Sequence, residues 1–161
     1  MRSMREVTAD LSPAERKILD DVEEHGVHIL SVPEHDEQCG FSATVGMWHS
    51  FEQPEVIVFG MPPEVARELL DVIADEASEG KTFLAGSQHK GLLQHYAVRF
   101  HAVPPALYSK YFAAATWAYE GAPFTAVQLV WPDKQGRWPW DEGVREVFRE
   151  CQPLLEREPA A

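Results

Sequence analysis

The sequence predicts a single α+β domain, in which helices pack on a mainly antiparallel β-sheet. The length of 161 residues suits one domain. Several apolar or alternating runs follow one another directly, and strands joined by short connections pair antiparallel because a parallel pair needs a long crossover. Segments with helical periodicity interrupt these runs without the strict strand–helix alternation of a doubly wound fold. We expect the domain to span residues 11–155, between a flexible N-terminus over residues 1–10 and a frayed tail over residues 156–161.

The first element is a helix with clear signals at both ends. Ser12 and Glu15 have the spacing of a capping box, with Pro13 between them at the first helical position. Gly26 is suited to ending the helix, because glycine adopts the left-handed conformation there without a steric penalty. The β-branched run over residues 27–32 then predicts a strand, and a polar loop follows it.

Two strands are predicted next, with different burial. Residues 41–48 alternate between apolar and polar or small side chains, which predicts a strand with one buried face. The run Val56-Ile57-Val58-Phe59 has no polar face. A short run of this kind is typical of a strand covered on both sides, so we expect it to be central in the sheet.

The second half of the chain alternates between helices and strands. A helix begins at residues 62–63 and ends at Gly80, and its predicted apolar stripe consists of Val65, Leu69, Val72 and Ile73. A weakly patterned segment precedes an alternating strand over residues 95–103, whose inner face we expect to hold Tyr96, Val98, Phe100 and Ala102. A helix opened by residues 104–105, a strand over 125–131, a turn at 133–136 and a last helix capped by Asp141 complete the series.

The charge balance argues against two classes of partner. Lys and Arg number 14 against 26 Asp and Glu, a net charge of −12. A surface of this sign repels phosphate backbones and anionic lipids, so we expect neither nucleic acid nor membrane partners. The charged start of the sequence lacks the apolar core of a signal peptide, and the cysteines, Cys39 and Cys151, suit free thiols. We therefore expect a cytoplasmic protein.

No cofactor or metal is expected. His25 and His28, followed by His35 and Cys39, resemble a series of zinc ligands, but structural zinc sites usually show tighter pairs. The sequence also lacks the glycine-rich phosphate-binding motifs and the serine motif of α/β-hydrolases.

Three ordered motifs resemble the DUF4262 family, bacterial domains of unknown function. They are GFSATVGMWH at residues 40–49 with QPEVIVFG at 53–60, YAVRFHAV at 96–103, and QLVWPD at 128–133 with GRWPW at 136–140. The likeness covers about residues 26–140. The chain departs from the family pattern at Ala43, Gln53 and Ala97, where Tyr, His and Pro are common. The resemblance implies no activity, so any function must be argued from the residues.

The first candidate site surrounds a turn before the central strand. Catalytic roles are predicted for His49 and Glu55, because an imidazole and a carboxylate at adjoining strand ends can share a hydrogen bond that raises the basicity of the imidazole. Thr44 and Trp48 lie beside them as candidate ligand-binding residues. The alternative is a surface turn in which Glu55 is polar because the strand begins there.

The second candidate site is aromatic. It consists of a segment rich in tryptophan, over residues 131–140, that could form a rigid wall for a flat ligand with an arginine as anion partner. The candidate binding residues are Arg99, Trp131, Asp133, Arg137 and Trp138. The alternative is that the tryptophans close the core, since a buried Trp contributes a large apolar area.

These sites support three hypotheses. The first is a pocket protein that binds a small organic ligand between the His49 turn and residues 131–140, with the question of catalysis left open. For this hypothesis we expect His49 and Glu55 to share a rim facing residues 131–140 across a cleft. The second is a non-catalytic acidic module, such as an immunity protein, with a basic protein partner. The third is a flavin-binding split barrel, from a faint likeness over residues 44–59.

Overall fold

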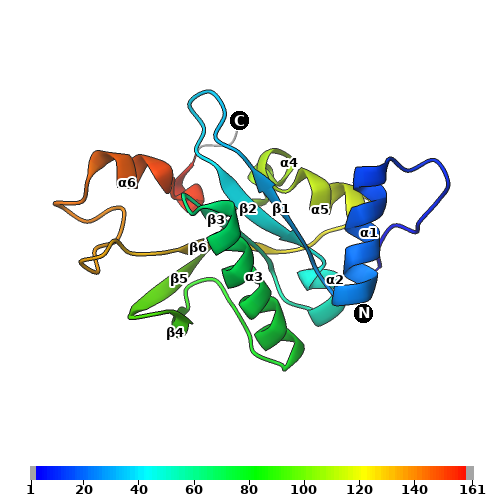
Figure 1. Cartoon of the computed structure of the whole chain (residues 1–161), viewed down its shortest axis with the longest axis horizontal. Helices are drawn as coiled ribbons and strands as arrows, with labels where there is room; N and C mark the ends of the chain where they lie inside the picture. The colour runs from blue at the N-terminus through cyan, green and yellow to red at the C-terminus, as the bar shows by residue number, and fades with distance from the viewer. Residues whose placement is uncertain (1–2, 159–161) are drawn as a thin grey trace.

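A six-stranded sheet forms the centre of the molecule, seen in the computed structural model of Figure 1, which describes residues 3–158. The strands follow the spatial order β1-β2-β3-β6-β5-β4. Their bounds are β1 His28–Val32, β2 Phe41–Val45, β3 Glu55–Phe59, β4 Gln88–Leu93, β5 Tyr96–Ala102 and β6 Ala126–Val130.

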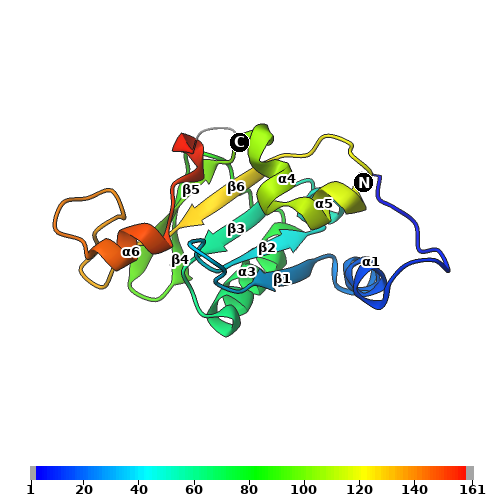
Figure 2. The same ribbon diagram turned by 90° about the horizontal axis from the view of Figure 1, so that it is seen from above.

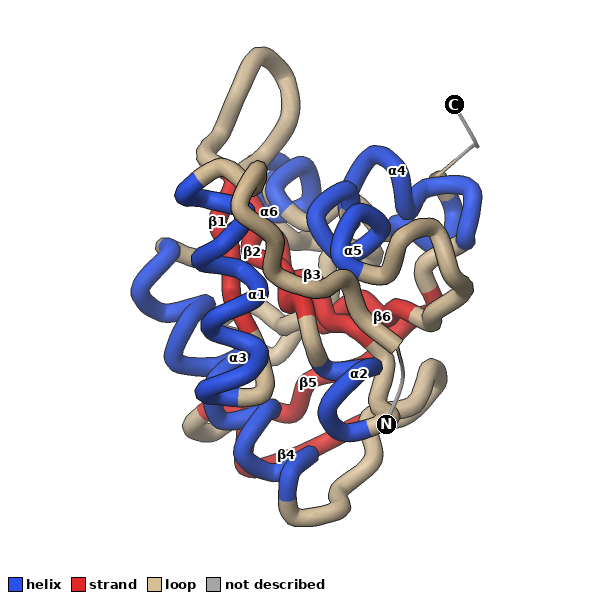
Figure 3. The backbone as a smooth tube through the Cα atoms, turned by 90° about the vertical axis from the view of Figure 1, so that its right-hand side faces the viewer, coloured by secondary structure: helices blue, strands red, loops and turns tan. Residues whose placement is uncertain are grey.

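The sheet is mostly antiparallel and open. Of its neighbouring pairs only β3 and β6 run parallel, with Glu55 opposite Ala126 at the start of both strands. β1 and β4 form the two edges and lie at opposite ends of the sheet (Figure 3). The predicted α+β class is confirmed. The sheet does not close on itself, so the structure does not support the split-barrel hypothesis.

Helices cover both faces of the sheet. α3 lies on one face, while α4 and α5 lie on the other, and α6 lies beyond the end of the sheet where β3 and β6 terminate (Figure 2). The helix bounds are α1 Pro13–His25, α2 Met47–Phe51, α3 Pro63–Ser78, α4 Tyr108–Tyr111, α5 Ala113–Ala118 and α6 Glu146–Cys151, with 3₁₀ turns at Pro105–Leu107 and Leu155–Arg157. No helix among residues 3–158 combines the length and apolar character needed to cross a membrane.

The signals of the first helix are confirmed in detail. The backbone N–H of Glu15 donates to the Ser12 hydroxyl at 3.1 Å, and the Ser12 N–H donates to the Glu15 carboxylate at 2.9 Å. Gly26 adopts a φ of +85°, and its N–H donates to the Val22 carbonyl. Both ends of the helix are therefore determined by local hydrogen bonds that the sequence specifies.

The central strand is also confirmed. Val56 to Phe59 each expose 1% or less of their surface, and β3 has β2 on one side and β6 on the other. Its side chains alternate between two apolar cores. Ile57 and Phe59 pack with α4 and α5, whereas Val56 and Val58 pack with α3. Burial on both faces explains the absence of polar residues in this run.

The predicted strand over residues 41–48 is wrong beyond Val45. Gly46 has a φ of +115°, which ends the strand, and α2 begins at Met47. A Cβ at Gly46 would lie 2.6 Å from the Gly26 carbonyl oxygen, so the chain needs glycine here. The expectation of one buried face also fails, because every residue of β2 is buried.

The stripe predicted for the second helix is partly wrong. Val65 and Val72 are 44% and 42% exposed. The buried face of α3 includes three alanines that the predicted stripe lacks. It consists of Ala66, Leu69, Leu70, Ile73, Ala74 and Ala77. The three alanines let the helix pack closely on the sheet, while Val65 and Val72 lie on its exposed side.

Four further expectations differ from the structure. The helix predicted after residues 104–105 is divided at Phe112, whose φ of −126° separates α4 from α5. α6 begins only at Glu146. Asp141 does not cap this helix, and its carboxylate instead accepts from the Trp138 N–H. Ala102 is exposed. Glu156 lies in a 3₁₀ turn next to the buried Leu155, while residues 159–161 of the expected tail lie outside the described residues.

Candidate functional site

The two candidate sites lie at opposite ends of the parallel strands β3 and β6. His49 and Glu55 are near the start of these strands, whereas Trp131 follows the end of β6. A strand of five residues spans about 16 Å at about 3.3 Å per residue. Figure 1 shows α2, which carries His49, far from α6 and the loop before it. The expected cleft between the His49 turn and residues 131–140 is therefore wrong.

Glu55 does not lie on a rim, because its side chain is fully buried. Its carboxylate accepts hydrogen bonds from the Thr44 hydroxyl at 2.7 Å and from the Tyr119 hydroxyl. It also accepts from three backbone amides at the start of α2, those of Gly46, Met47 and Trp48, at 3.1–3.2 Å. The His49 imidazole is not among these donors.

The ionisation of this cluster follows from burial and donors. Burial raises the pKa of the Glu55 carboxyl, and the hydrogen bonds from Tyr119, Thr44 and the α2 amides oppose the rise. Burial and the neighbouring carboxylate raise the pKa of Tyr119, so its hydroxyl keeps its proton and donates. The arrangement joins β2, α2, β3 and α5, and it leaves Glu55 without access to a substrate.

The other residues of the first site are structural or peripheral. Thr44 is fully buried, and its hydroxyl accepts from the Val56 N–H while it donates to Glu55. The Trp48 ring packs at the edge of one core. The backbone N–H of His49 donates to the Tyr119 hydroxyl at 3.2 Å, and its side chain borders a hollow beneath the N-terminal segment.

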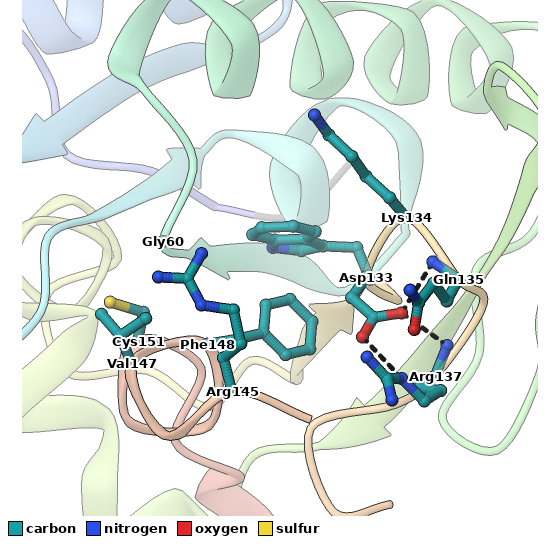
Figure 4. Close-up of a pocket in the computed structure, with 10 residues that line it drawn as sticks. Gly60, Asp133, Lys134, Gln135, Arg137, Arg145, Val147, Phe148 and Cys151 are labelled. Carbon is teal, nitrogen blue, oxygen red and sulfur yellow. Dashed lines mark hydrogen bonds and ion pairs between the residues drawn. The ribbon is translucent and has the colours of Figure 1, made fainter. Parts of the chain in front are cut away.

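A pocket of about 460 Å³ lies at the opposite end of the strands, between the loop after β6 and α6 (Figure 4). It contains three of the residues predicted to bind a ligand, Trp131, Asp133 and Arg137. The remaining lining residues are Gly60, Lys134, Gln135, Arg145, Val147, Phe148 and Cys151.

Two aromatic rings make up much of the apolar wall. The rings of Trp131 and Phe148 meet edge to face, with centroids 5.2 Å apart. The Trp131 indole is held in place because its Nε1–H donates to the Phe59 carbonyl at 2.8 Å. The Trp131 backbone N–H also donates to the Gln152 side-chain oxygen, and the Gln152 side-chain NH₂ donates to the Trp131 carbonyl. A flat ligand would therefore meet a wall that is already ordered.

A rigid turn forms the polar wall. The Gly136 N–H donates to the Asp133 carbonyl at 2.9 Å, as the predicted turn requires. The Asp133 carboxylate accepts from the backbone N–H groups of Gln135 and Arg137 at 2.9 Å and from the Arg137 guanidinium at 3.0 Å (Figure 4). These bonds fix the side chains of Asp133 and Arg137 relative to one another.

Arg99 and Trp138 belong to a separate aromatic layer and do not line the pocket. The Trp138 and Trp140 rings stack almost parallel, 5.7 Å apart. The Arg99 guanidinium lies 4.4 Å from the Trp138 ring centre and donates to Gln88. The cation–π contact explains why these residues occur together without any ligand.

The histidines and the cysteine that resemble a series of zinc ligands do not lie together in the structure. Across residues 3–158, no three side chains among His, Cys, Asp and Glu form a group that could hold a metal ion. His28 pairs instead with Asp21 at 2.8 Å, and the Cys39 thiol donates to the Glu150 carbonyl. Both cysteines are free. Burial, the neighbouring Cys151 thiol and the carboxylates of Glu34 and Glu150 raise the pKa of Cys39 to about 11.

Sequence reasoning missed the half of the pocket that α6 provides. Val147, Phe148 and Cys151 of α6 line the pocket, and α6 lies beyond the end of the sheet (Figure 2). Nothing in the sequence except their charge indicated that Arg145 and Lys134 would line a pocket. The missed burial of Glu55 had one available signal, since only residues 46–54 connect two buried strands and Glu55 is the first residue of the second strand.

The chain belongs to the family of the domain of unknown function DUF4262, whose family profile matches residues 21–145. The resemblance noted in the sequence is thereby confirmed. Curated proteins gave no match, and solved structures gave none.

Glu55→Gln tests the buried cluster. The amide would place an NH₂ group where the carboxylate accepts backbone amides, because each carboxylate oxygen accepts at least one N–H from α2. We expect a loss of about 2–4 kcal/mol of unfolding free energy in urea denaturation, since a buried donor left unsatisfied costs about 1–3 kcal/mol. Glu68→Gln, the same change on the exposed side of α3, should cost less than about 0.5 kcal/mol. Equal effects of the two changes would contradict the assignment.

Alkylation tests the environment of Cys39. With a pKa of about 11 instead of 9.0, its thiolate fraction at pH 8 is about a hundredfold lower. We expect iodoacetamide to modify Cys39 about a hundredfold more slowly in the native protein than in urea, as followed by peptide mass spectrometry, with the native rate still rising above pH 9. Native and unfolded rates that agree within a factor of three would refute this environment.

Proposed function

We propose that this protein binds a small organic molecule with a flat, apolar part in the pocket between residues 131–137 and α6. The observation that carries the proposal is the aromatic wall, in which an ordered Trp131 contacts Phe148 in the lining of a pocket. Ligand pockets commonly combine apolar walls of this kind with a few fixed polar groups.

Three further features support binding at this place. The volume of about 460 Å³ falls within the range of about 300–1,000 Å³ that is usual for small-molecule sites. Asp133 and Arg137 are already held by hydrogen bonds, so little ordering would be needed when a ligand enters. Phe148 is only partly buried although it is large and apolar, and a ligand would cover it.

The chemistry of the lining supports binding and gives no catalytic assignment. Cys151 is the only strong nucleophile among the described lining residues, and no histidine lies in the lining with it. The carboxylate of Asp133 is engaged by Arg137. We place the protein in the cytoplasm, as its two free thiols suit a reducing compartment. A basic protein partner is supported only by the net charge.

The proposal predicts that filling the pocket abolishes binding. We expect indole or indole-3-acetate to bind with a Kd on the order of 0.1–1 mM, as suits ligands of this size, measured by isothermal titration calorimetry. Val147→Trp should abolish binding because Val147 lines the pocket and is 53% exposed. Val72→Trp, at a similarly exposed position of α3, should bind as the wild type does.

Two outcomes would overturn the proposal. The first is that neither indole nor indole-3-acetate binds the wild-type protein. The second is that the Val147→Trp variant binds these probes as tightly as the Val72→Trp variant does. Circular dichroism of both variants confirms that each is folded before the comparison is made.

A further inference from the structure

We propose that the ligand of this pocket is an organic anion, with a carboxylate or phosphate group held by Arg145 and Lys134 beside the aromatic wall. This inference rests on the proposed function and specifies the class of molecule that the pocket accepts.

The first argument is the charge of the pocket. Its lining holds three cationic side chains, Lys134, Arg137 and Arg145, and one carboxylate, Asp133. The chain as a whole carries a net charge of −12. A positive pocket in an acidic protein attracts an anion locally, while the remaining surface repels one.

The second argument concerns which of these charges are already neutralised. Arg137 and Asp133 form an ion pair at 3.0 Å. Burial opposes the shift, but hydrogen bonds from the Arg137 and Gln135 amides and the nearby guanidinium lower the pKa of the Asp133 carboxyl, so it stays ionised and paired. Asp133 and Arg137 therefore cancel, and the excess positive charge of the pocket comes from Arg145 and Lys134.

The third argument is that these two cations have no partner within residues 3–158. The ion pairs and side-chain hydrogen bonds of the described chain involve neither the Arg145 guanidinium nor the Lys134 ammonium group. Other arginines of the same region are engaged, such as Arg149, which donates to the Pro139 and Asp141 carbonyls. Although the sequence has 26 Asp and Glu residues, none of those within residues 3–158 pairs with these two cations.

The fourth argument is direction. Arg145 extends from the start of α6 toward Gly60 and past Phe148, so its guanidinium lies over the open space of the pocket (Figure 4). Its planar group can donate two parallel hydrogen bonds to a carboxylate or a phosphate. A flat ring placed against Phe148 would bring an attached acidic group within reach of Arg145.

The test compares three probes of one shape and different charge. Indole-3-acetate is an anion, indole is neutral and tryptamine is a cation at pH 7. In calorimetric titrations at 50 mM NaCl we expect indole-3-acetate to bind at least tenfold more tightly than indole, and tryptamine to bind more weakly than indole. Raising NaCl to 500 mM should weaken only the binding of indole-3-acetate, because salt screens the ionic contact.

Arg145→Gln supplies the decisive variant. The Arg145 side chain does not cap α6, so the change leaves the helix intact. We expect it to weaken indole-3-acetate about tenfold and to leave indole unchanged. Lys134→Gln, on an exposed turn, should act in the same direction. Arg157→Gln removes the same charge outside the pocket and should alter neither affinity.

The outcomes separate the two proposals. Equal affinity for indole and indole-3-acetate, or an equal loss of both in Arg145→Gln, overturns the anion inference and leaves the pocket itself in place. An absence of binding by both indole and indole-3-acetate overturns the proposed function together with the inference.

Discussion

A buried carboxylate holds together the corner at which β2 becomes α2 and α2 leads into β3. Glu55 accepts five hydrogen bonds from groups of β2, α2 and α5. Three of them come from amides at the start of a helix only five residues long. Such a helix has no independent stability in water, so its position depends on this anchor and on packing. Burying a carboxylate is costly, and the cost is offset here because both of its oxygens are fully used.

The two ends of the parallel strands β3 and β6 differ in how completely their polar groups are paired. Polar groups near the start of β3 satisfy one another and leave no side chain of Glu55 or Thr44 exposed. At the far end the packing is less complete, since Phe148 is only partly buried and the Arg145 guanidinium has no ion-pair partner among the described residues. The structure thus contains two polar clusters of opposite character. One is fully buried and closes the fold, and the other lines an open pocket with Arg145 and Lys134.

The sequence predicted the parts of the fold that local rules determine. The capping box at Ser12 and the apolar run at Val56 need no knowledge of distant contacts, and both predictions are confirmed. The α3 stripe was only partly predicted because three alanines share its buried side with Leu69 and Ile73, and the periodicity of large residues could not show this. The prediction that Glu55 lies on an exposed rim was wrong for a different reason. A carboxylate is normally exposed, and only the three-dimensional meeting of five donors makes its burial tolerable.

The candidate site was predicted in part for the same reasons. Trp131, Asp133 and Arg137 lie close together in the sequence, and their turn was recognisable from it. Arg99 and Trp138 are far apart in the sequence, and in the structure they contact one another and do not line the pocket. The α6 side of the pocket depends on where that helix docks against the sheet. Docking of this kind is a long-range property, which no local pattern in residues 145–151 could reveal.

Hydrogen exchange of the α2 amides tests the central claim most directly. If Glu55 anchors the corner, the Met47 and Trp48 N–H groups open only when the whole domain unfolds. Their free energy of exchange, measured by NMR in D₂O, should then equal that of Val58 in β3 within about 1 kcal/mol. Exchange of these two amides through local opening, at a free energy several kcal/mol below that of Val58, would contradict the account.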